Sequence, residues 1–329
     1  MDTIKSFDRD LYSVNDGNFG DIALQLFHFQ VENNRVYRDY VHHLGVDPNA
    51  VSTLEQVPFL PISFFKNHDI KTGVWTAETS FTSSGTTGQR TSTHPVRSMH
   101  FYLQHSVRCF EYFFGEISQH QFLALLPSYL ERSGSSLVAM IANFIEKSRS
   151  NVSGFYLHNV DDLLKDLERS ENEKKKTVLW GVTFALLDLA ERYNPDLSHC
   201  LIFETGGMKG RRQEITRQEL HLRLKQAFRV EKIYSEYGMT ELLSQAYSRG
   251  ENAFFCPPWM KVLGRDISDP MEKGLLNETA GINVIDLANV DSIAFIETED
   301  IGRVYHDGSF EVLGRLDNSD VRGCSLMVE

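Results

Sequence analysis

The N-terminal part of the chain has a helical pattern of apolar positions. Between residues 21 and 44, apolar and aromatic side chains recur at broadly helical spacing, at Ile22, Leu26, Phe29, Tyr37 and Tyr40. The pattern stops at Gly45, with Pro48 just beyond, which is typical of a helix end. We therefore expect an N-terminal helical layer, followed over residues 50–80 by a proline-containing extended connection.

From residue 98 onward, helical and extended patterns alternate. The sequence predicts helices over residues 98–114, 135–147, 160–168, 184–193 and 212–228. It predicts strands over residues 121–126, 152–156, 177–182, 200–203 and 232–235. Because strands alternate with helices, the expected fold class is α/β, with a parallel sheet covered by helices.

Beyond residue 250 the pattern becomes shorter and more strand-like. Strands are expected over residues 292–296, 303–305 and 310–313, and Asp307-Gly308 is typical of a hairpin turn between the last two. The chain is expected to divide into three regions: an α/β body over residues 1–250, a small β-rich subdomain over residues 251–316, and a hinge with a short tail over residues 317–329.

Composition and charge narrow the class of protein. The 329 residues are 41% hydrophobic and 24% charged, which suffices for one large or two medium domains with a full core. The formal net charge of -12 disfavours nucleic acid or an anionic membrane surface as the main partner, since both need clustered Lys and Arg. A bound nucleotide must then be held by local geometry.

Cysteine usage and the N-terminus indicate a cytoplasmic protein. The four cysteines, Cys109, Cys200, Cys256 and Cys324, are too widely spaced for a CxxC pair. Acidic residues stand where a signal peptide would have its apolar stretch, and no run approaches 18 uncharged apolar residues. We expect neither a leader sequence nor a membrane span.

The first candidate for chemistry is a hydroxyl-rich glycine loop. It consists of Thr82, Ser83, Ser84, Gly85, Thr86, Thr87 and Gly88. Backbone N–H and side-chain O–H groups of such a loop can converge on a polyanion. Gln89 and Arg90 stand where a Walker A loop needs Lys and then Ser or Thr, which argues against a phosphoryl-transfer NTPase. Taken alone, the run could equally be a solvated loop.

The second candidate follows about 150 residues later. Thr240 and Glu241 offer a hydroxyl for a phosphate oxygen and a carboxylate for Mg²⁺, directly after Tyr237 and the flexible Gly238. The alternative is an ordinary strand end at which Thr240 caps a helix.

Taken together, five ordered motifs carry a family resemblance. They are SSGTTG at residues 83–88, FETGGM at 203–208, YGMTE at 237–241, ETEDIG at 297–302 and GRLDN at 314–318. In this order the chain resembles the acyl-adenylate-forming superfamily, which includes acyl-CoA ligases, luciferases and nonribosomal adenylation domains. The resemblance implies the fold of that superfamily's large N-terminal domain, with a C-terminal lid domain that is absent or vestigial.

Within the superfamily, the chain most resembles the acyl-protein synthetases of LuxE type. The resemblance rests on DNSDVRGC at residues 317–324, PFLP at 58–61 and FFK at 64–66. In that family an acyl-AMP forms and the acyl group passes to a cysteine near the C-terminus. Cys324 is the cysteine that suits this role.

The resemblance also implies roles for individual residues, with ATP and Mg²⁺ as cofactors. Residues 82–88 would hold the β- and γ-phosphates, Thr240 the α-phosphate and Glu241 the Mg²⁺. Asp300 would bind the ribose hydroxyls with Arg315 nearby. The adenine would lie between Tyr237 and the Gly206-Gly207 turn, and the acyl tunnel would be lined by Trp180, Gly181 and Thr183. Asp300 as a plain turn residue and Arg315 as a surface ion-pair partner remain alternatives.

Two departures from the superfamily pattern affect the expected chemistry. Only 12 residues follow Asp317 and none is a lysine, although the superfamily's C-terminal domain supplies one. Either a short tail suffices, a partner completes the site, or the chain is truncated. Glu299 replaces the glycine of the superfamily's TGD motif and adds a negative charge near the nucleotide.

Three functional hypotheses follow. The leading one is ATP-dependent activation of a carboxylic acid, expected to be a fatty acid, with transfer to Cys324 and then to a protein acceptor such as a reductase or carrier. The second is direct transfer from acyl-AMP to coenzyme A or a carrier protein. The third is a catalytically degenerate subunit that binds an acyl group or a nucleotide.

Overall fold

The computed structural model describes residues 7, 11–83, 91–126, 134–156, 159–206 and 215–316. Within these residues, five parallel strands form one half of a large sheet: β4 (His120–Leu125), β5 (Gly154–Tyr156), β6 (Lys176–Val182), β7 (Cys200–Thr205) and β8 (Ile233–Tyr237). Their spatial order is β8-β7-β6-β4-β5. All six residues of β4 are buried, as expected for a strand with helices on both faces.

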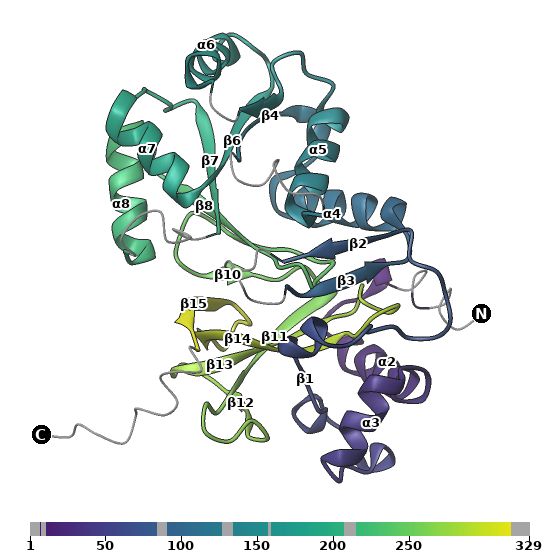
Figure 1. The fold of residues 1–329 in the computed structure, drawn as a ribbon. Coiled ribbons are helices and arrows are strands. Elements are labelled where there is room, and N and C mark those ends of the chain that lie inside the picture. The colour runs from purple at the N-terminus through teal and green to yellow at the C-terminus, as the bar shows by residue number, and fades with distance from the viewer. Residues whose placement is uncertain are drawn as a thin grey trace, which may run out of the picture.

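Helices cover both faces of this parallel half (Figure 1). They are α4 (Met99–Phe114), α5 (Ser136–Ser148), α6 (Val160–Ser170), α7 (Thr183–Tyr193) and α8 (Arg217–Phe228). Helices α4 and α5 lie on one face, and α7 and α8 lie on the other. The predicted α/β alternation is confirmed over this region. The start predicted for α8 at residue 212 was wrong, because the Thr216 side chain caps the helix by accepting a hydrogen bond from the Glu219 amide.

The C-terminal part of the described chain extends the same sheet with antiparallel strands. These strands are β9 (Ala246–Ser248), β10 (Phe254–Phe255), β11 (Met260–Arg265), β12 (Lys273–Leu275), β13 (Ala280–Asp286), β14 (Phe295–Val304) and β15 (Phe310–Arg315). The sheet runs in the order β12-β11-β13-β14-β15-β10-β9-β8, and β1 (Leu60–Pro61) adds in parallel to β14. The hairpin predicted at Asp307-Gly308 joins β14 to β15.

One strand prediction in this region was wrong. Residues 292–296 and 303–305 were predicted as separate strands, but β14 continues from Phe295 to Val304 and contains the whole ETEDIG motif. The motif is polar because Thr298 and Asp300 are buried and hydrogen-bonded, whereas Glu297 and Glu299 point to the half-exposed side. Because the motif is polar, the sequence did not predict this part of β14, although its side chains alternate regularly between buried and half-exposed positions.

The N-terminal helical layer is confirmed and is broken once. It consists of α2 (Phe19–Asn33) and α3 (Arg35–His43). At the break, the Asn34 side chain accepts a hydrogen bond from the Tyr37 amide and donates one to the Ser292 carbonyl oxygen. Short 3-10 turns complete this layer and its connections: η1 (Leu11–Ser13), η2 (Pro48–Ala50), η3 (Leu54–Gln56), η4 (Ile62–Lys66) and η5 (Ile117–Gln119).

A separate two-stranded hairpin flanks the hydroxyl-rich loop. It consists of β2 (Thr79–Thr82) and β3 (Thr93–Val96), which pair in antiparallel fashion. In Figure 1 it lies beside α4, between the parallel half of the sheet and the N-terminal helices. The hairpin therefore holds both ends of the loop over the sheet.

Aromatic side chains fill the space between α4 and the sheet. The Trp180 and Phe203 rings stack with centroids 4.7 Å apart, and Phe203 stacks on Tyr234 at 5.2 Å. Phe114 of α4 meets the edges of Phe203 and Tyr234. Stacked and edge-on rings add about 0.5–1.5 kcal/mol per pair beyond area burial, so this layer fixes how α4 sits on the sheet.

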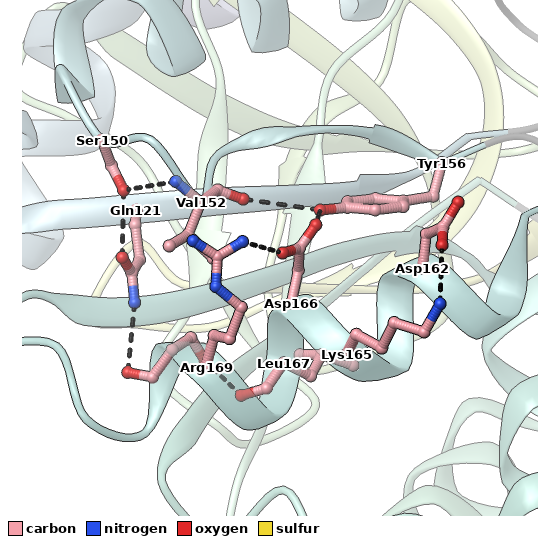
Figure 2. Close-up of polar contacts among 10 residues, drawn as sticks. Gln121, Ser150, Val152, Tyr156, Asp162, Lys165, Asp166, Leu167 and Arg169 are labelled. Carbon is pink, nitrogen blue, oxygen red and sulfur yellow. Dashed lines mark hydrogen bonds and ion pairs between the residues drawn. The ribbon is translucent and has the colours of Figure 1, made fainter.

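Polar contacts fix α6 at the edge of the sheet (Figure 2). The Tyr156 hydroxyl donates to Asp166 Oδ2 at 2.7 Å, and Arg169 Nη1 lies 2.9 Å from Asp166 Oδ1. Ser150 Oγ donates to the Gln121 side-chain oxygen at 3.0 Å, which ties the loop after α5 to β4.

No helix in the described ranges has the length and apolar character needed to cross a membrane.

Candidate nucleotide and carboxylate site

The candidate site lies where β7 and β8 end. Gly206 follows β7 with a left-handed φ of 72°, and Gly238 directly follows β8. Open α/β sheets bind ligands at the carboxyl ends of their strands, so this edge is the expected place for a ligand. The β2–β3 hairpin and the β14–β15 hairpin approach the same edge through Ser92, Asp300 and Arg315.

Three of the predicted nucleotide residues are in direct contact. The Tyr237 hydroxyl donates to Asp300 Oδ2 at 2.8 Å, and Arg315 Nε donates to Asp300 Oδ1 at 3.3 Å. The Asp300 amide donates a hydrogen bond to Thr298 Oγ1 at 3.1 Å, which fixes the backbone that carries the carboxylate. Asp300 is 6% exposed, so an ordinary surface turn residue is excluded as a description of it. An ionised carboxylate offers about four acceptor positions, which leaves room for ribose hydroxyls.

The Tyr237 ring has neighbours of its own. It meets Phe310 edge-on at 5.1 Å and packs against Phe254 at 5.6 Å, and it is 8% exposed. The polar contact of Tyr237 in the structure is the hydrogen bond from its hydroxyl to Asp300. Adenine stacking on this ring stays a prediction.

Side chains from two segments, His94 of β3 and Asn289 after β13, hold the loop that carries Thr240 and Glu241. His94 Nδ1 lies 2.8 Å from the Thr240 carbonyl oxygen, and because that oxygen only accepts, Nδ1 donates. Burial lowers the pKa of His94 to about 4, so the ring is neutral at pH 7. Asn289 Nδ2 donates to the Glu241 carbonyl oxygen at 2.7 Å. Both carbonyl groups are thus satisfied without regular secondary structure.

A buried carboxylate anchors the continuation of this loop. Asp286 accepts from the Leu243 amide at 2.8 Å, the Ser244 amide at 2.9 Å and Ser244 Oγ at 2.5 Å. Asp286 is fully buried, and the side chain also accepts from the Ala288 amide. Burial raises the pKa of Asp286, while these hydrogen bonds oppose the rise. The anchor connects β13 to the segment that follows Glu241.

The Glu241 side chain is nearly enclosed. It is 4% exposed, and burial raises its pKa, while a hydrogen bond from Ser92 and the charge of Arg315 favour the ionised form. No group of three or more His, Cys, Asp or Glu side chains suited to a metal ion occurs in the described ranges. Mg²⁺ commonly takes only one or two protein carboxylates, with phosphates and water completing its shell, so one Glu241 carboxylate fits such an ion.

Two residues of the hydroxyl-rich loop lie in the described part. The Ser83 amide donates to the Ser92 carbonyl oxygen at 3.1 Å, and the Ser92 amide donates to Ser83 Oγ at 2.9 Å. The Thr82 amide donates to the Gly134 carbonyl oxygen at 2.9 Å. The remaining predicted loop residues lie outside the described ranges: Ser84, Gly85, Thr86, Thr87 and Gly88.

A polar network holds the Gly206 turn from the α7–α8 face. Thr183 Oγ1 donates to the Gly206 carbonyl oxygen at 2.9 Å and lies 3.3 Å from Glu204 Oε2. Glu204 Oε1 accepts from Ser235 Oγ at 2.6 Å. Thr183 therefore supports the turn in this structure.

Some predicted residues lie outside the described ranges. They are Gly207, Cys324 and the Asp317-Asn318 hinge.

The structure shows what surrounds the unexpected Glu299. Its Oε1 lies 3.9 Å from Lys66 Nζ, and both side chains are 37% exposed. Lys66 belongs to the FFK segment, which η4 carries beside β14. The added negative charge is thus offset by a cation from the N-terminal part of the chain.

Two of the residues predicted for the acyl tunnel are packed into the core. Trp180 is fully buried against Phe203, and a Cβ added at Gly181 would lie 2.7 Å from Leu186 Cδ2. A tunnel along this strand stays a prediction.

Sequence analysis missed three residues that lie at or beside the site: Glu236, His94 and Asp286. For Asp286, the available signal was a single acidic residue at the end of an apolar strand.

Comparison with known proteins identifies the fold. No protein-family model and no curated protein matches the sequence. A similar solved structure is 2-hydroxyisobutyryl-CoA ligase in complex with 2-HIB-AMP and CoA, with a TM-score of 0.70 and 14% identity over 92% of this chain and 68% of that chain.

Two further solved structures are similar to this chain at lower TM-scores. ATP-bound MatB from Rhodopseudomonas palustris has a TM-score of 0.55 and 17% identity over 72% of this chain and 47% of that chain. The amide bond synthetase McbA from Marinactinospora thermotolerans has a TM-score of 0.50 and 20% identity, over 73% and 49%. The chain spans about half the length of MatB and McbA. It therefore has the α/β fold of the N-terminal domain of acyl-adenylate-forming enzymes.

Proposed function

We propose that this chain activates a carboxylic acid with ATP, forming an acyl-AMP and releasing pyrophosphate. The observation that carries the proposal is the meeting of three sequence motifs at one carboxylate. Asp300 of ETEDIG contacts Tyr237 of YGMTE and Arg315 of GRLDN, although 63 residues separate Tyr237 from Asp300. An α/β sheet without a ligand does not require this hydrogen-bonded cluster at its ligand-binding edge, where Tyr237 and Asp300 are buried and Arg315 is exposed.

In this proposal each side chain has a separate task. Asp300 accepts hydrogen bonds from the ribose hydroxyls, and Thr240 donates its hydroxyl to the α-phosphate. Glu241 would hold Mg²⁺, which supplies positive charge beside the phosphates when bound. Hydrogen bonds from His94 and Asn289 keep the loop that carries Thr240 and Glu241 in place. Little reorganisation is therefore needed as negative charge develops on the leaving pyrophosphate.

The later steps rest on the resemblance to acyl-protein synthetases. We include in the proposal a fatty acid as substrate, transfer of the acyl group from acyl-AMP to the Cys324 thiolate, and passage to a protein acceptor in the cytoplasm. Attack by the thiolate forms the thioester and expels AMP. Direct transfer to coenzyme A is the second candidate, because the similar ligase structure contains CoA.

Product analysis tests the adenylation step. The purified chain is incubated with labelled ATP, Mg²⁺ and a panel of acids, and the nucleotide products are separated. AMP and pyrophosphate are expected, in amounts that depend on the acid. ADP and phosphate as the acid-dependent products would refute the proposal, because they report attack at the γ-phosphorus.

A labelled acid tests the thioester step. Label should remain on the protein after denaturation, should be released by hydroxylamine, and should be lost in Cys324→Ala. Full labelling of Cys324→Ala would rule out this cysteine, and acyl-CoA formation that survives the substitution would favour the second candidate. AMP formation in the same reactions reports adenylation independently of either outcome.

A further inference from the structure

Two glutamates at neighbouring strand ends, the buried Glu204 and the half-buried Glu236, differ in their partners. Side chains alternate along a strand, so Glu204 of β7 faces α7 and α8, whereas Glu236 of β8 faces α4 together with Thr205 and Tyr234. Glu204 Oε1 lies 3.3 Å from Arg217 Nε and 3.5 Å from His221 Nε2. The Arg217 guanidinium group matches the charge of Glu204.

Glu236 has no such match. Its Oε2 accepts from Thr205 Oγ1 at 2.6 Å, and within the described ranges no Lys, Arg or His lies at ion-pair distance from it. Burial, with repulsion from Glu204, raises the pKa of Glu236 to about 7. A carboxylate held this way is strongly disfavoured as a charged group unless a cation or further donors reach it.

A buried acceptor without a hydrogen-bond partner among the described residues lies close to Glu236. Gln245 is 4% exposed, and its Oε1 is buried with no hydrogen-bond partner among the described residues. Both side chains border Gly238: a Cβ added there would lie 2.2 Å from Glu236 Oε1 and 3.4 Å from Gln245 Cγ. The Glu236 carboxylate therefore packs directly against the glycine, and the Gln245 side chain borders the same residue at the end of β8.

We propose that Glu236 and Gln245 receive an ammonium group of the acid substrate, so that the chain activates amino-substituted carboxylic acids. This inference rests on the proposed adenylation, and it puts an amino-substituted acid in place of the unsubstituted fatty acid included above. An ammonium group brings one positive charge and three donors, which matches one carboxylate and one amide oxygen. A hydrocarbon chain at this place would leave Gln245 Oε1 unpaired and the charge of Glu236 unmatched, which disfavours an unsubstituted fatty acid.

The position of the acceptors limits where the amino group lies on the substrate. Thr240, the proposed α-phosphate ligand, is two residues beyond Gly238, and two residues span at most about 7 Å. The reacting carboxylate must lie next to the α-phosphate. The ammonium group is therefore expected near the carboxylate, and acids with the amino group on the second, third or fourth carbon test this range.

The test compares matched acids in ATP–pyrophosphate exchange. The panel pairs 2-, 3- and 4-amino acids with unsubstituted acids of the same chain length. The intact chain should prefer the amino acids by about 10-fold or more in kcat/KM. In Glu236→Gln this preference should fall by about 10- to 100-fold, mainly through KM, because a hydrogen bond to a charged group is lost. Gln245→Met should weaken it less.

Controls keep the outcomes distinct. Glu168→Gln replaces an exposed glutamate on α6 and should leave the preference unchanged. Circular dichroism verifies that Glu236→Gln is folded. Exchange supported by unsubstituted acids alone, unchanged in Glu236→Gln, would overturn this inference and leave adenylation intact. Absence of exchange with every acid would overturn both.

Discussion

At the scale of single residues, the site depends on carboxylates in different surroundings. Asp300 is ordered by a tyrosine hydroxyl, a guanidinium group and a backbone contact to Thr298. Glu241 is nearly enclosed, and Glu236 has no Lys, Arg or His at ion-pair distance among the residues that the structure describes. Because these three carboxylates have different hydrogen-bond partners and different burial, single isosteric substitutions separate their roles.

Asp300→Asn should impair nucleotide binding. The amide keeps the size of the side chain but removes its charge and one acceptor, so KM for ATP should rise about 10- to 100-fold. The measurement is KM for ATP in exchange assays. Asp307→Asn, in the exposed turn between β14 and β15, serves as the control. An unaltered KM in Asp300→Asn would show that Asp300 does not contact the nucleotide.

Glu236 should make stability fall as the pH rises. Its pKa is about 7 in the folded chain and about 4.5 in the unfolded chain, so between these values the folded state binds more protons. The free energy of unfolding contributed by Glu236 therefore decreases from pH 4.5 to pH 7. Groups facing this carboxyl are Tyr102, Cys109 and Tyr247, which stay neutral over this range because burial raises the pKa of each.

The measurement is urea unfolding of the intact chain and of Glu236→Gln at pH 5 and pH 7.5. The difference between the two proteins is decisive, because buried His94, with its pKa lowered to about 4, gives the opposite slope. Removing the carboxyl should make the variant relatively more stable at pH 7.5 than at pH 5. A constant difference across this range would contradict the environment described for Glu236.

At the scale of elements, β14 and β15 position the nucleotide residues through close backbone contact. Gly302 of β14 lies opposite β15, where the register shifts. A Cβ added at Gly302 would lie 2.0 Å from the Glu311 carbonyl oxygen and 2.9 Å from Ile282 Cδ1. The backbone oxygen cannot move aside as a flexible side chain can.

Gly302→Ala should therefore lower the free energy of unfolding by roughly 1–3 kcal/mol, since overpacked sites force backbone shifts. It should also reduce exchange, because Asp300 is two residues away. Gly314→Ala, in the same hairpin, meets no atom within 4 Å and should have little effect. Chemical denaturation of both variants is the measurement, and equal stability of the two would contradict the strand packing.

Element patterns show how far the sequence could be used for prediction. The parallel half followed from apolar runs such as that of β4, because such strands are buried on both faces. The course of β14 did not follow, because its buried polar residues are paired with distant partners such as Tyr237. Likewise, the motifs identified Asp300 and Arg315, but the anchors His94 and Asp286 contact the site only through tertiary structure.

At the scale of the whole molecule, one chain of hydrogen bonds connects distant segments. Asp286 of β13 accepts from Ser244, Ser244 Oγ lies 2.8 Å from His105 Nε2 of α4, and His105 Nδ1 lies 3.1 Å from the Tyr12 hydroxyl. The bonds of Ser244 to Asp286 and His105 are buried, so water replaces them poorly. It ties the loop after Glu241 to both halves of the sheet.

Ser244→Ala should destabilise the fold by roughly 1–3 kcal/mol, because it leaves buried polar partners at Asp286 and His105. Exchange should fall as well, since the loop carrying Glu241 loses one anchor. Thermal and chemical unfolding test the first effect. Ser268→Ala, at an exposed turn, should stay within about 0.5 kcal/mol of the intact chain, and a similarly small effect for Ser244→Ala would count against the connection.

The central claim is that this chain forms acyl-AMP, and ATP–pyrophosphate exchange tests it most directly. The purified chain is assayed with short, long, aromatic and amino-substituted acids, with Glu241→Ala as the control. The account predicts exchange that depends on one class of acid and is abolished in Glu241→Ala. Exchange that is absent with every acid, or that is unchanged in Glu241→Ala, would contradict it.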